Sequence, residues 1–575
     1  MLSSGGLCRF RFLGRRVNIF RSRTGSRLPV VRGAVLNLFA ALWLLALLNQ
    51  PFWSALWESV GGWHASRAGF LITLPVFALV WVWTVLELLT WGRAAKPVLC
   101  IVMVLSAAVA FFMHRYGIAF DRGMVANVME TDPAEARELL SAGMVLWILG
   151  LGVVPALVIA MWPRAPQGVV GTLTEKVVTL AGLILVVGAI LVFQSGSYIS
   201  LFRAHRDLRL QFVPTNYLSA VQGYAKVKLK PKREIEQVSL GATRVASDPA
   251  TQRPMVLVLV VGETMRAANL SVNGYERETT PLLAGRKSLV NFGRTGSCGT
   301  ATAVSLPCMF LDVGRGGYED GMAFRRESLL DVLQRAGMDV WWLSNNSGCK
   351  GVCDRVQVVD VPATLPAGAC GPGGCQDNVL IDALKKRLES VQRDTVVVMH
   401  MKGQHGPAYY LRYPPEFERY GPSCRDNALD RCGPEQVVNA YDNAVSYSDY
   451  ILDKTIDALQ SQANRLDSSM VFVSDHGESL GEKGMFLHGM PYDFAPTVQK
   501  EVPFMAWLPQ ATRDRLQIDA GCLASRRDQL SHDNLYHSVL GLTSTRASTY
   551  RDDLDVFAPC RTGSVIAANA KGGKP

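Results

Sequence analysis

Five long apolar segments in the first third of the chain constrain its fold more than any other feature. They cover approximately residues 34–53, 69–91, 97–120, 143–162 and 177–194. Each is close to the ~20 residues that a helix needs to cross the hydrocarbon core of a bilayer. One such segment alone is also compatible with a buried core helix, but five in succession predict a membrane domain with five transmembrane helices. A chain of 575 residues then retains ample length for a separate globular domain.

Basic residues mark one side of the membrane. Eight arginines precede the first apolar segment. Further basic residues separate the second segment from the third and the fourth from the fifth, namely Arg93, Lys96, Arg164 and Lys176. Under the positive-inside rule these regions are cytoplasmic, so an odd number of spans places everything after about Ser195 on the opposite side. The net charge of +10 is partly this arginine-rich start, and no basic helix with base-reading residues indicates a nucleic-acid partner.

These patterns predict the order of domains. In sequence they are a basic cytoplasmic N-terminus (1–33), a transmembrane domain (34–196), an amphipathic linker (197–236), an exported globular domain (237–561) and a disordered tail (562–575). The linker interleaves apolar and basic residues at helical spacing, which suits a helix lying on anionic lipid headgroups. After Gly223 a solvated linker is an equal alternative.

Ten of the twelve cysteines belong to the exported part. An even set in an oxidising compartment indicates disulfides. The spacing suggests that neighbours pair: Cys298 with Cys308, Cys349 with Cys353, Cys370 with Cys375, Cys424 with Cys432, and Cys522 with Cys560. The alternative is a zinc site at Cys349 and Cys353, but histidines at zinc-finger spacing are missing nearby.

Chemically active side chains follow four short apolar runs of the exported part. They are Glu263 after residues 255–261, Asn346 after 339–343, His405 after 395–399, and Asp475 with His476 after 470–473. Each run is typical of a buried strand. In open α/β sheets, sites form outside the carboxyl ends of the strands. The sequence therefore predicts an α/β domain whose chemistry gathers at one edge of the sheet.

Small hydroxyl residues lie between Cys298 and Cys308. A threonine hydroxyl is a poor nucleophile at neutral pH and must be activated by a base or a metal. Two carboxylates, one imidazole and an alkoxide make a four-coordinate shell that suits Zn²⁺. Chemistry alone does not decide between Thr302, Thr300 and Ser305 as the reacting residue.

Several short motifs occur in a characteristic order along this part of the chain. They are Gly262-Glu263-Thr264, Cys298-Gly299-Thr300-Ala301-Thr302, Gly348-Cys349-Lys350, Gln404-His405-Gly406-Pro407 and Ser474-Asp475-His476-Gly477-Glu478. Together they resemble the phosphoethanolamine transferases that modify lipid A, including the mobile colistin-resistance enzymes. The resemblance covers nearly the whole chain, although the basic extension before Gly33 is longer than the family leads us to expect. It implies a multi-pass protein of the bacterial inner membrane, with five spans and a periplasmic domain of the α/β/α alkaline phosphatase and sulfatase fold.

The resemblance also implies roles for particular residues. Thr302 would be the nucleophile, and the zinc ligands beside it would be Glu263, Asp475 and His476. His405 and His488 would bind the phosphoryl group, protonate the leaving oxygen or hold a second zinc ion. One further group would contact the phosphoethanolamine itself: Asn346, Lys350 and Glu478.

A last group lies between the third and fourth apolar segments, on the predicted outer face. Its members are Asn127, Thr131 and Glu135. They are four residues apart and would share one side of a helix, and by resemblance they would bind the lipid substrate. Pro133 suits the first turn of a helix better than its middle, so a helix-capping role for Thr131 is the alternative.

The reaction implied by the resemblance is a two-step transfer. Thr302 would take phosphoethanolamine from phosphatidylethanolamine, and a phosphate of lipid A would accept it, which confers resistance to polymyxins and other cationic peptides. Alternatives are another envelope acceptor (Kdo, heptose or a periplasmic glucan) and transfer to water by a membrane-anchored phosphodiesterase or sulfatase. The Cys/Ser-x-Pro-x-Arg loop typical of sulfatases is missing around Thr302.

Overall fold

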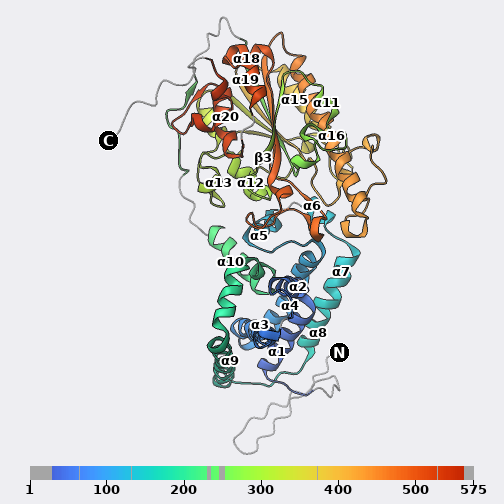
Figure 1. Ribbon diagram of the computed structural model, residues 1–575, viewed down its shortest axis with the longest axis vertical. Coiled ribbons are helices and arrows are strands. Elements are labelled where there is room, and N and C mark those ends of the chain that lie inside the picture. The colour runs from blue at the N-terminus through green and yellow to red at the C-terminus, as the bar shows by residue number, and fades with distance from the viewer. Residues whose placement is uncertain are drawn as a thin grey trace, which may run out of the picture.

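The computed structural model describes residues 29–63, 65–130, 133–228, 235–244, 253–371, 373–526 and 529–562. Helices formed by the first part of the chain make one half of the molecule, and a sheet domain formed by the second part makes the other (Figure 1). Two short helices, α5 (Arg122–Glu130) and α6 (Pro133–Glu138), lie between the two halves. Most of the predicted basic N-terminus, residues 1–28, and the predicted tail from residue 563 lie outside the described residues.

Four long helical stretches of the described chain are apolar enough to cross a membrane. They are Ala68–Leu89, Gly92–Tyr116, Ala142–Met161 and Val169–Ala204. They correspond to helix α3 (Ala68–Leu89), helix α4 (Ala95–Tyr116) with the turn before it, helices α7 (Ala142–Ile148) and α8 (Val154–Met161) joined by a π-helical turn, and helix α9 (Val169–Ala204). A fifth span is present if the bent pair Gly33–Leu48 and Gln50–Ser59 is counted as one.

The first predicted span, 34–53, is not one straight helix. Helix α1 (Gly33–Trp43) continues through a π-helical turn to Leu48, and helix α2 (Gln50–Ser59) then leaves at an angle of 68°. At the bend, the Asn49 amide donates to the carbonyl oxygens of Leu44 and Val213, both at 3.0 Å, and accepts from the Val213 N–H at 2.9 Å. Pro51 has no N–H to donate and is tolerated in the first turn of α2. The bend therefore depends on a residue 164 positions away.

Helix α9 has 36 residues and is longer at both ends than the predicted span 177–194. Lys176, expected in a cytoplasmic loop, lies inside α9 and is buried against the carboxylate of Glu87. At the other end, Tyr198 packs against Phe70 and Phe77 of α3, with ring centroids 5.1 and 4.6 Å away. A 3₁₀ helix, η5 (Arg206–Gln211), and helix α10 (Thr215–Lys228) follow where the amphipathic linker is predicted.

A seven-stranded sheet forms the centre of the second half. Its strand order is β3-β10-β7-β2-β6-β4-β5. The strands are β2 (Met255–Gly262), β3 (Leu289–Gly296), β4 (Asp339–Ser344), β5 (Gln357–Asp360), β6 (Thr395–His400), β7 (Asp467–Ser474) and β10 (Glu501–Trp507). Strands β7, β2, β6, β4 and β5 run parallel, whereas β10 is antiparallel to both of its neighbours.

Helices cover both faces of this sheet. Alternate residues of β2 belong to different hydrophobic clusters: Leu257 and Leu259 pack with α14 (Leu329–Arg335) and α20 (Asp533–Leu542), and Val258 packs with α15 (Asn378–Glu389) and α16 (Pro434–Gln460). All eight residues of β2 are buried, which explains its unbroken apolar sequence, since a parallel sheet is covered on both faces.

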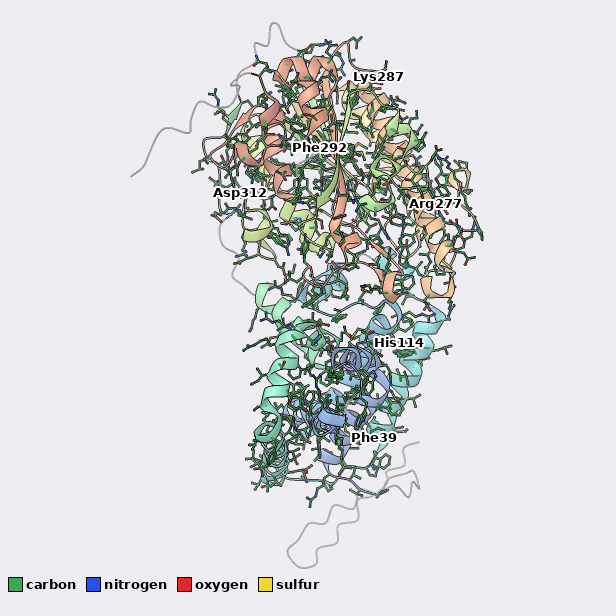
Figure 2. All side chains as sticks on the ribbon, in the orientation of Figure 1. Phe39, His114, Arg277, Lys287, Phe292 and Asp312 are labelled. Carbon is green, nitrogen blue, oxygen red and sulfur yellow. A yellow bond between two sulfur atoms is a disulfide. The ribbon has the colours of Figure 1, made fainter. Side chains whose placement is uncertain are left out.

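Aromatic rings fill the interior beside strand β3. Phe292 lies inside the sheet domain, with its ring centroid 5.4 Å from Phe504 and 6.0 Å from Phe557 (Figure 2). His114 lies in the helical half, where its ring stacks on Trp147 at 5.4 Å. The structure thus separates this histidine from those of the sheet domain.

Disulfides join cysteines that are neighbours along the sequence. The five bridges are Cys298–Cys308, Cys349–Cys353, Cys370–Cys375, Cys424–Cys432 and Cys522–Cys560. The zinc alternative at Cys349 and Cys353 is excluded by their bond to each other. All five of these bridges lie in the sheet domain.

Candidate active site

The carboxyl ends of the parallel strands open into a cavity of about 130 Å³ between the two halves of the molecule. The sheet domain contributes Glu263, Thr302, Asn346, Lys350, His405 and His488 to its lining. The helical half contributes Phe112, Ile118, Phe120, Met124, Asn127 and Leu139. Polar groups therefore face an apolar wall that belongs to the membrane domain.

Thr302 is the first residue of helix α12 (Thr302–Met309). Its hydroxyl oxygen lies 3.1 Å from both carboxylate oxygens of Glu263 and 3.2 Å from Nε2 of His476. The two alternative hydroxyls point elsewhere: Thr300 donates to the carbonyl oxygen of Met490 at 2.5 Å, and Ser305 donates to that of Asp475. Of these three residues, only Thr302 directs its hydroxyl to the acidic cluster.

Glu263, Asp475 and His476 form a candidate metal site. One ligand atom from each lies within 4.8 Å of the others, and all three side chains are buried. Oδ2 of Asp475 is buried without a hydrogen-bond partner, although buried polar atoms are nearly always paired. Nδ1 of His476 contacts the carbonyl oxygen of Gly477 at 2.9 Å, which leaves Nε2 directed at the cluster. Two carboxylates and an imidazole fit a divalent cation such as Zn²⁺.

The electrostatics of this cluster favour positive charge beside its buried carboxylates. Burial and the nearby charge of Glu263 raise the pKa of Asp475 to about 7. Burial alone would lower the pKa of His476, but the charges of Asp475 and Glu263 raise it to about 10. Both shifts arise because two buried carboxylates and an imidazole lie at close range, an arrangement that favours positive charge among them.

His405 and His488 lie beside the cluster. Their ring centroids are 5.7 Å apart, and the ring of His488 is 4.4 Å from that of His476. Nδ1 of His488 is 2.7 Å from the Glu478 carboxylate, which also accepts a hydrogen bond of 2.6 Å from the Tyr409 hydroxyl. The two imidazoles expected from the motifs are thus brought together at the cavity.

Glu478 lies next to His488 but is not part of the cavity lining. It is fully buried, it does not line the cavity, and its two oxygens face His488 and Tyr409. Glu478 therefore orients His488 in this structure, and the contact with phosphoethanolamine that the resemblance implies stays a prediction. The physical reason is that a buried carboxylate needs partners within the protein.

The other expected substrate-binding residues are distributed as follows. Asn346 donates to Glu263 Oε2 at 2.9 Å and to the carbonyl oxygen of Met401 at 2.9 Å. Lys350 lines the cavity from a backbone conformation with φ of 53°, which is uncommon for a residue other than glycine. Asn127 lines it from α5. Thr131 lies outside the described residues, and of Glu135 only the backbone is described, in α6.

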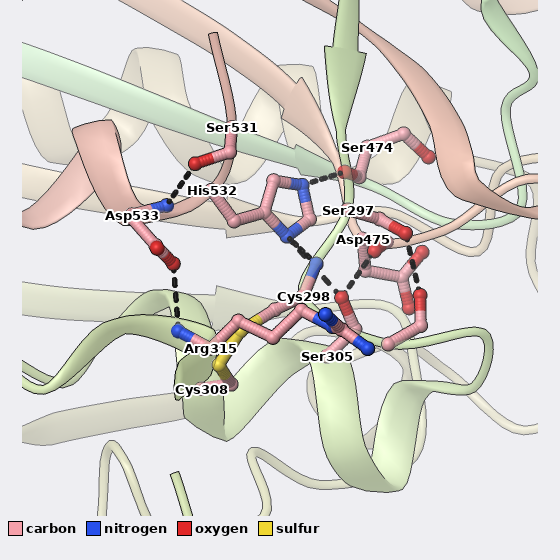
Figure 3. Close-up of a disulfide and its surroundings, with 11 residues drawn as sticks. Ser297, Cys298, Ser305, Cys308, Arg315, Ser474, Asp475, Ser531, His532 and Asp533 are labelled. Carbon is pink, nitrogen blue, oxygen red and sulfur yellow. Dashed lines mark hydrogen bonds between the residues drawn. A yellow bond between two sulfur atoms is a disulfide. The ribbon is translucent and has the colours of Figure 1, made fainter. Parts of the chain in front are cut away.

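His532 connects the nucleophile loop to the sheet, a role that the sequence analysis missed. Nδ1 of His532 accepts from the Cys298 N–H at 3.1 Å, and Nε2–H donates to the Ser474 carbonyl oxygen at 2.9 Å (Figure 3). Burial lowers the pKa of His532 to about 4, so the ring is neutral. No sequence signal could have found these contacts, because the first joins residues 234 positions apart.

The parallel-sheet fold and the buried cluster of carboxylates and imidazole define a membrane-anchored domain with a candidate metal site beside a threonine. Comparison with known proteins agrees with this description. Residues 256–545 match the family model described as Sulfatase, and residues 76–229 match the one described as Phosphoethanolamine transferase EptA/EptB. The chain is 38% identical over 539 residues to phosphoethanolamine transferase EptA of Salmonella typhimurium, covering 93% of this chain and 98% of the relative. It is 35% identical to phosphatidylethanolamine transferase Mcr-1 of Escherichia coli, covering 90% and 96%.

A solved structure shows the same architecture over the full length. The integral membrane lipooligosaccharide phosphoethanolamine transferase A of Neisseria meningitidis matches with a TM-score of 0.88 and 36% identity, covering 93% of this chain and 100% of that one. This chain belongs to the phosphoethanolamine transferase family. The expected combination of a helical membrane domain and a sulfatase-fold periplasmic domain is confirmed, and the protein is a multi-pass protein of the inner membrane.

Proposed function

We propose that the protein transfers phosphoethanolamine from phosphatidylethanolamine to a phosphate of lipid A through a phosphoethanolamine-threonine intermediate on Thr302. The observation that carries this proposal is the Thr302 hydroxyl, which lies 3.1 Å from Glu263 and 3.2 Å from His476 in a cavity with an apolar wall. A lipid donor needs both an activated hydroxyl for its phosphorus and an apolar surface for the start of its acyl chains.

The cation at the cluster is zinc in this proposal. A zinc ion held by Glu263, Asp475 and His476 would supply positive charge that lowers the pKa of the Thr302 hydroxyl and offsets charge on the transferring group. Oδ2 of Asp475 is buried without a hydrogen-bond partner and lies 3.4 Å from Nε2 of His476, which supports a cation at this place. His405 and His488, whose rings are 5.7 Å apart, offer further imidazoles for a second ion or for proton transfer.

In the first step, the Thr302 oxygen attacks the phosphorus of the donor. The bond from phosphorus to the glycerol oxygen breaks, the hydroxyl proton of Thr302 is lost, and the departing diacylglycerol gains a proton. His405 and His488 line the same cavity and are the groups we assign to this proton transfer. Lys350 lines the cavity as well and is assigned to the phosphoryl oxygens.

In the second step, an oxygen of an acceptor phosphate attacks the same phosphorus. The bond from phosphorus to Thr302 breaks, and the threonine regains its proton. Asn346, which donates to Glu263 Oε2 at 2.9 Å, holds that carboxylate in place through both steps. The threonine oxygen thus forms a bond to phosphorus in the first step and loses it in the second. Donor and acceptor therefore use the same cavity in turn.

A matched pair of isosteric variants tests this function. Thr302→Val and Thr300→Val each remove one hydroxyl from the same loop. Lipid A from cells that express the parent or Thr300→Val should gain phosphoethanolamine by mass spectrometry, whereas cells with Thr302→Val should yield unmodified lipid A. Modified lipid A in the Thr302→Val cells would move the nucleophile elsewhere. Release of free phosphoethanolamine by the parent without lipid A modification would instead establish a hydrolase.

A further inference from the structure

A second, larger cavity lies in the membrane domain, outside the active site. Its volume is about 920 Å³, within the range of about 300–1,000 Å³ typical of ligand pockets. It lies between α3, the end of α9, η5 and α10. Helices α9 and α10 lie along one side of the helical half (Figure 1). It is mostly apolar, and part of its lining faces the lipid.

One wall of this cavity follows helix α3 through the membrane. The lining residues of α3 are Leu74, Phe77, Ala78, Trp81, Val85 and Leu89. At a rise of 1.5 Å per residue they extend over about 22 Å of helix, more than half of the ~30 Å hydrocarbon core. A groove of this length and composition has the dimensions of a lipid acyl chain.

The mouth of the groove carries two arginines. Arg209 of η5 is exposed, and the side chain of Arg122, at the start of α5, is 49% exposed while its Nε contacts Asp320 at 2.8 Å. Asp121 is the one carboxylate that lines this mouth among the described residues, and its Oδ1 accepts from the Met124 N–H at 2.9 Å. The guanidinium groups of Arg209 and Arg122 are therefore exposed at this mouth, where a lipid headgroup would lie.

The groove is next to the active site. Phe120 lines both the groove and the active-site cavity. Neither Arg122 nor Arg209 lines the active-site cavity, however, so a phosphate held at the mouth is not the phosphate that reacts at Thr302. A lipid bound in this way and presented to Thr302 needs two phosphates on one headgroup.

We propose that this groove binds the acceptor, a diphosphorylated lipid A, with an acyl chain along α3 and one phosphate on Arg209 and Arg122 while the other phosphate reaches Thr302. This proposal rests on the function proposed above. Phosphatidylethanolamine has a single phosphate and no net charge, so it does not satisfy both positions. An arginine near a membrane surface attracts anionic lipid, so a charge reversal removes that attraction and adds repulsion.

Two variants and two matched controls test the groove in the full-length protein. Arg209→Glu reverses the charge at the mouth, and Arg206→Glu makes the same change at an exposed residue of η5 that does not line the groove. Ser219→Trp fills the groove from α10, and Val221→Trp places the same side chain at a 50% exposed position of α10 outside it. Transfer is measured with phosphatidylethanolamine as donor and diphosphoryl or monophosphoryl lipid A as acceptor.

We expect Arg209→Glu and Ser219→Trp to raise the KM for diphosphoryl lipid A about tenfold, with the KM for phosphatidylethanolamine within about twofold of the parent. The two controls should match the parent. With the parent protein, the KM for monophosphoryl lipid A should be higher than that for diphosphoryl lipid A. Arg209→Glu should raise the KM for monophosphoryl lipid A little further, because the phosphate that Arg209 would bind is already missing from that lipid. Equal KM values for the two lipids, or a rise in the donor KM alone, would overturn the proposal.

A binding measurement separates this proposal from the proposed function. Full-length Thr302→Val, which cannot turn over, is mixed with diphosphoryl lipid A and examined by native mass spectrometry. We expect a one-to-one complex that is lost on adding Arg209→Glu and retained on adding Arg206→Glu. If the parent transfers nothing to lipid A but this pattern holds, only the proposed function fails. If both double variants bind equally, the groove proposal fails regardless of turnover.

Discussion

At the scale of single residues, the site depends on buried charged groups whose partners set their orientation. Glu478 is the clearest case, since its oxygens face Nδ1 of His488 at 2.7 Å and the hydroxyl of Tyr409 at 2.6 Å. A carboxylate behind an imidazole fixes the tautomer and the ring orientation, and loss of such a partner typically reduces activity about 10–100-fold.

We therefore predict that Glu478→Gln lowers kcat for transfer by about tenfold or more while the bound metal content stays at the parent level, because Glu478 is not a ligand of the cluster. Glu482→Gln is the control, since Glu482 pairs with Arg266 outside the cavity and should keep parental kcat. Steady-state kinetics and metal analysis measure the two quantities. The result that would contradict this role of Glu478 is a Glu478→Gln variant that loses metal. Its metal-loaded molecules would then show parental kcat.

His400 gives a prediction about acid stability. Burial lowers the pKa of its imidazole to about 4, whereas the unfolded chain protonates near the ordinary value of about 6.5. Below pH ~6.5 the unfolded state binds the proton that the folded state excludes, so stability is full above that pH and declines as the pH falls toward about 4.

We predict that His400→Met lessens the acid sensitivity of the full-length protein in detergent. Between about pH 7.5 and pH 5, His400 alone accounts for roughly 2 kcal/mol of lost stability, so the variant's melting temperature should fall less than the parent's over that interval. His114→Gln, at an exposed histidine of the helical half, is the control. Equal shifts in melting temperature for His400→Met and the parent would refute the prediction.

At the scale of elements, the nucleophile is presented by the start of one short helix. Thr302 opens α12, the Cys298–Cys308 bridge ties the preceding loop to the end of that helix, and His532 connects the same loop to strand β7 (Figure 3). The disulfide and the His532 contacts therefore both restrain the loop that precedes Thr302. Their common effect is to hold the Thr302 oxygen at the cluster.

We predict that replacing Cys298 and Cys308 together by serine affects catalysis more than stability. A bridge that closes about ten residues contributes on the order of 2–3 kcal/mol, whereas a displacement near 1 Å at a reacting atom lowers rates about 100-fold. Turnover of fluorescent phosphatidylethanolamine and thermal unfolding are measured on the same preparation, with metal content as a check. The pair Cys424→Ser and Cys432→Ser, far from Thr302 along the chain, is the control. A double variant with a lower melting temperature that, while folded, turns over at the parental rate would refute the idea that the Cys298–Cys308 bridge positions Thr302.

At the scale of the whole molecule, a buried ion pair joins the two halves behind the active site. Glu138 of α6 pairs with Arg412 of the sheet domain, and both side chains are more than nine-tenths buried. Arg412 also donates to the His405 carbonyl oxygen at 2.6 Å. The membrane domain is thereby connected, through one arginine, to the backbone of a histidine that lines the cavity.

We predict that Glu138→Gln lowers transfer by about tenfold or more, because the contact that positions the His405 segment loses its charge. Glu236→Gln removes an exposed carboxylate that pairs with Arg326 within the sheet domain, and it should have little effect, since exposed pairs contribute only about 0–1 kcal/mol. The measurement is kcat and KM for both variants at equal metal content. Parental kcat and KM in Glu138→Gln would show that the ion pair between Glu138 and Arg412 does not affect the position of His405.

Much of the architecture could be predicted from the sequence because the determining interactions are local. Apolar length alone identified the membrane segments, unbroken apolar runs located β2, β4, β6 and β7, and the polar residues after those strands assembled at one sheet edge. Four of the five disulfides join cysteines at most ten residues apart for the same reason, since short loops keep their ends close, whereas Cys522 and Cys560 are 38 residues apart.

Only the tertiary structure decided the features that depend on residues far apart in the chain. The bend at Asn49 requires Val213, the nucleophile loop requires His532, and the link to His405 requires Glu138 and Arg412. The sequence left three hydroxyls open, and packing alone directed Thr302 to the cluster and turned Glu478 away from the cavity. Hydropathy and spacing report short-range order, whereas the partner of each buried polar group is set by which elements pack together, and that choice exists only in the folded chain.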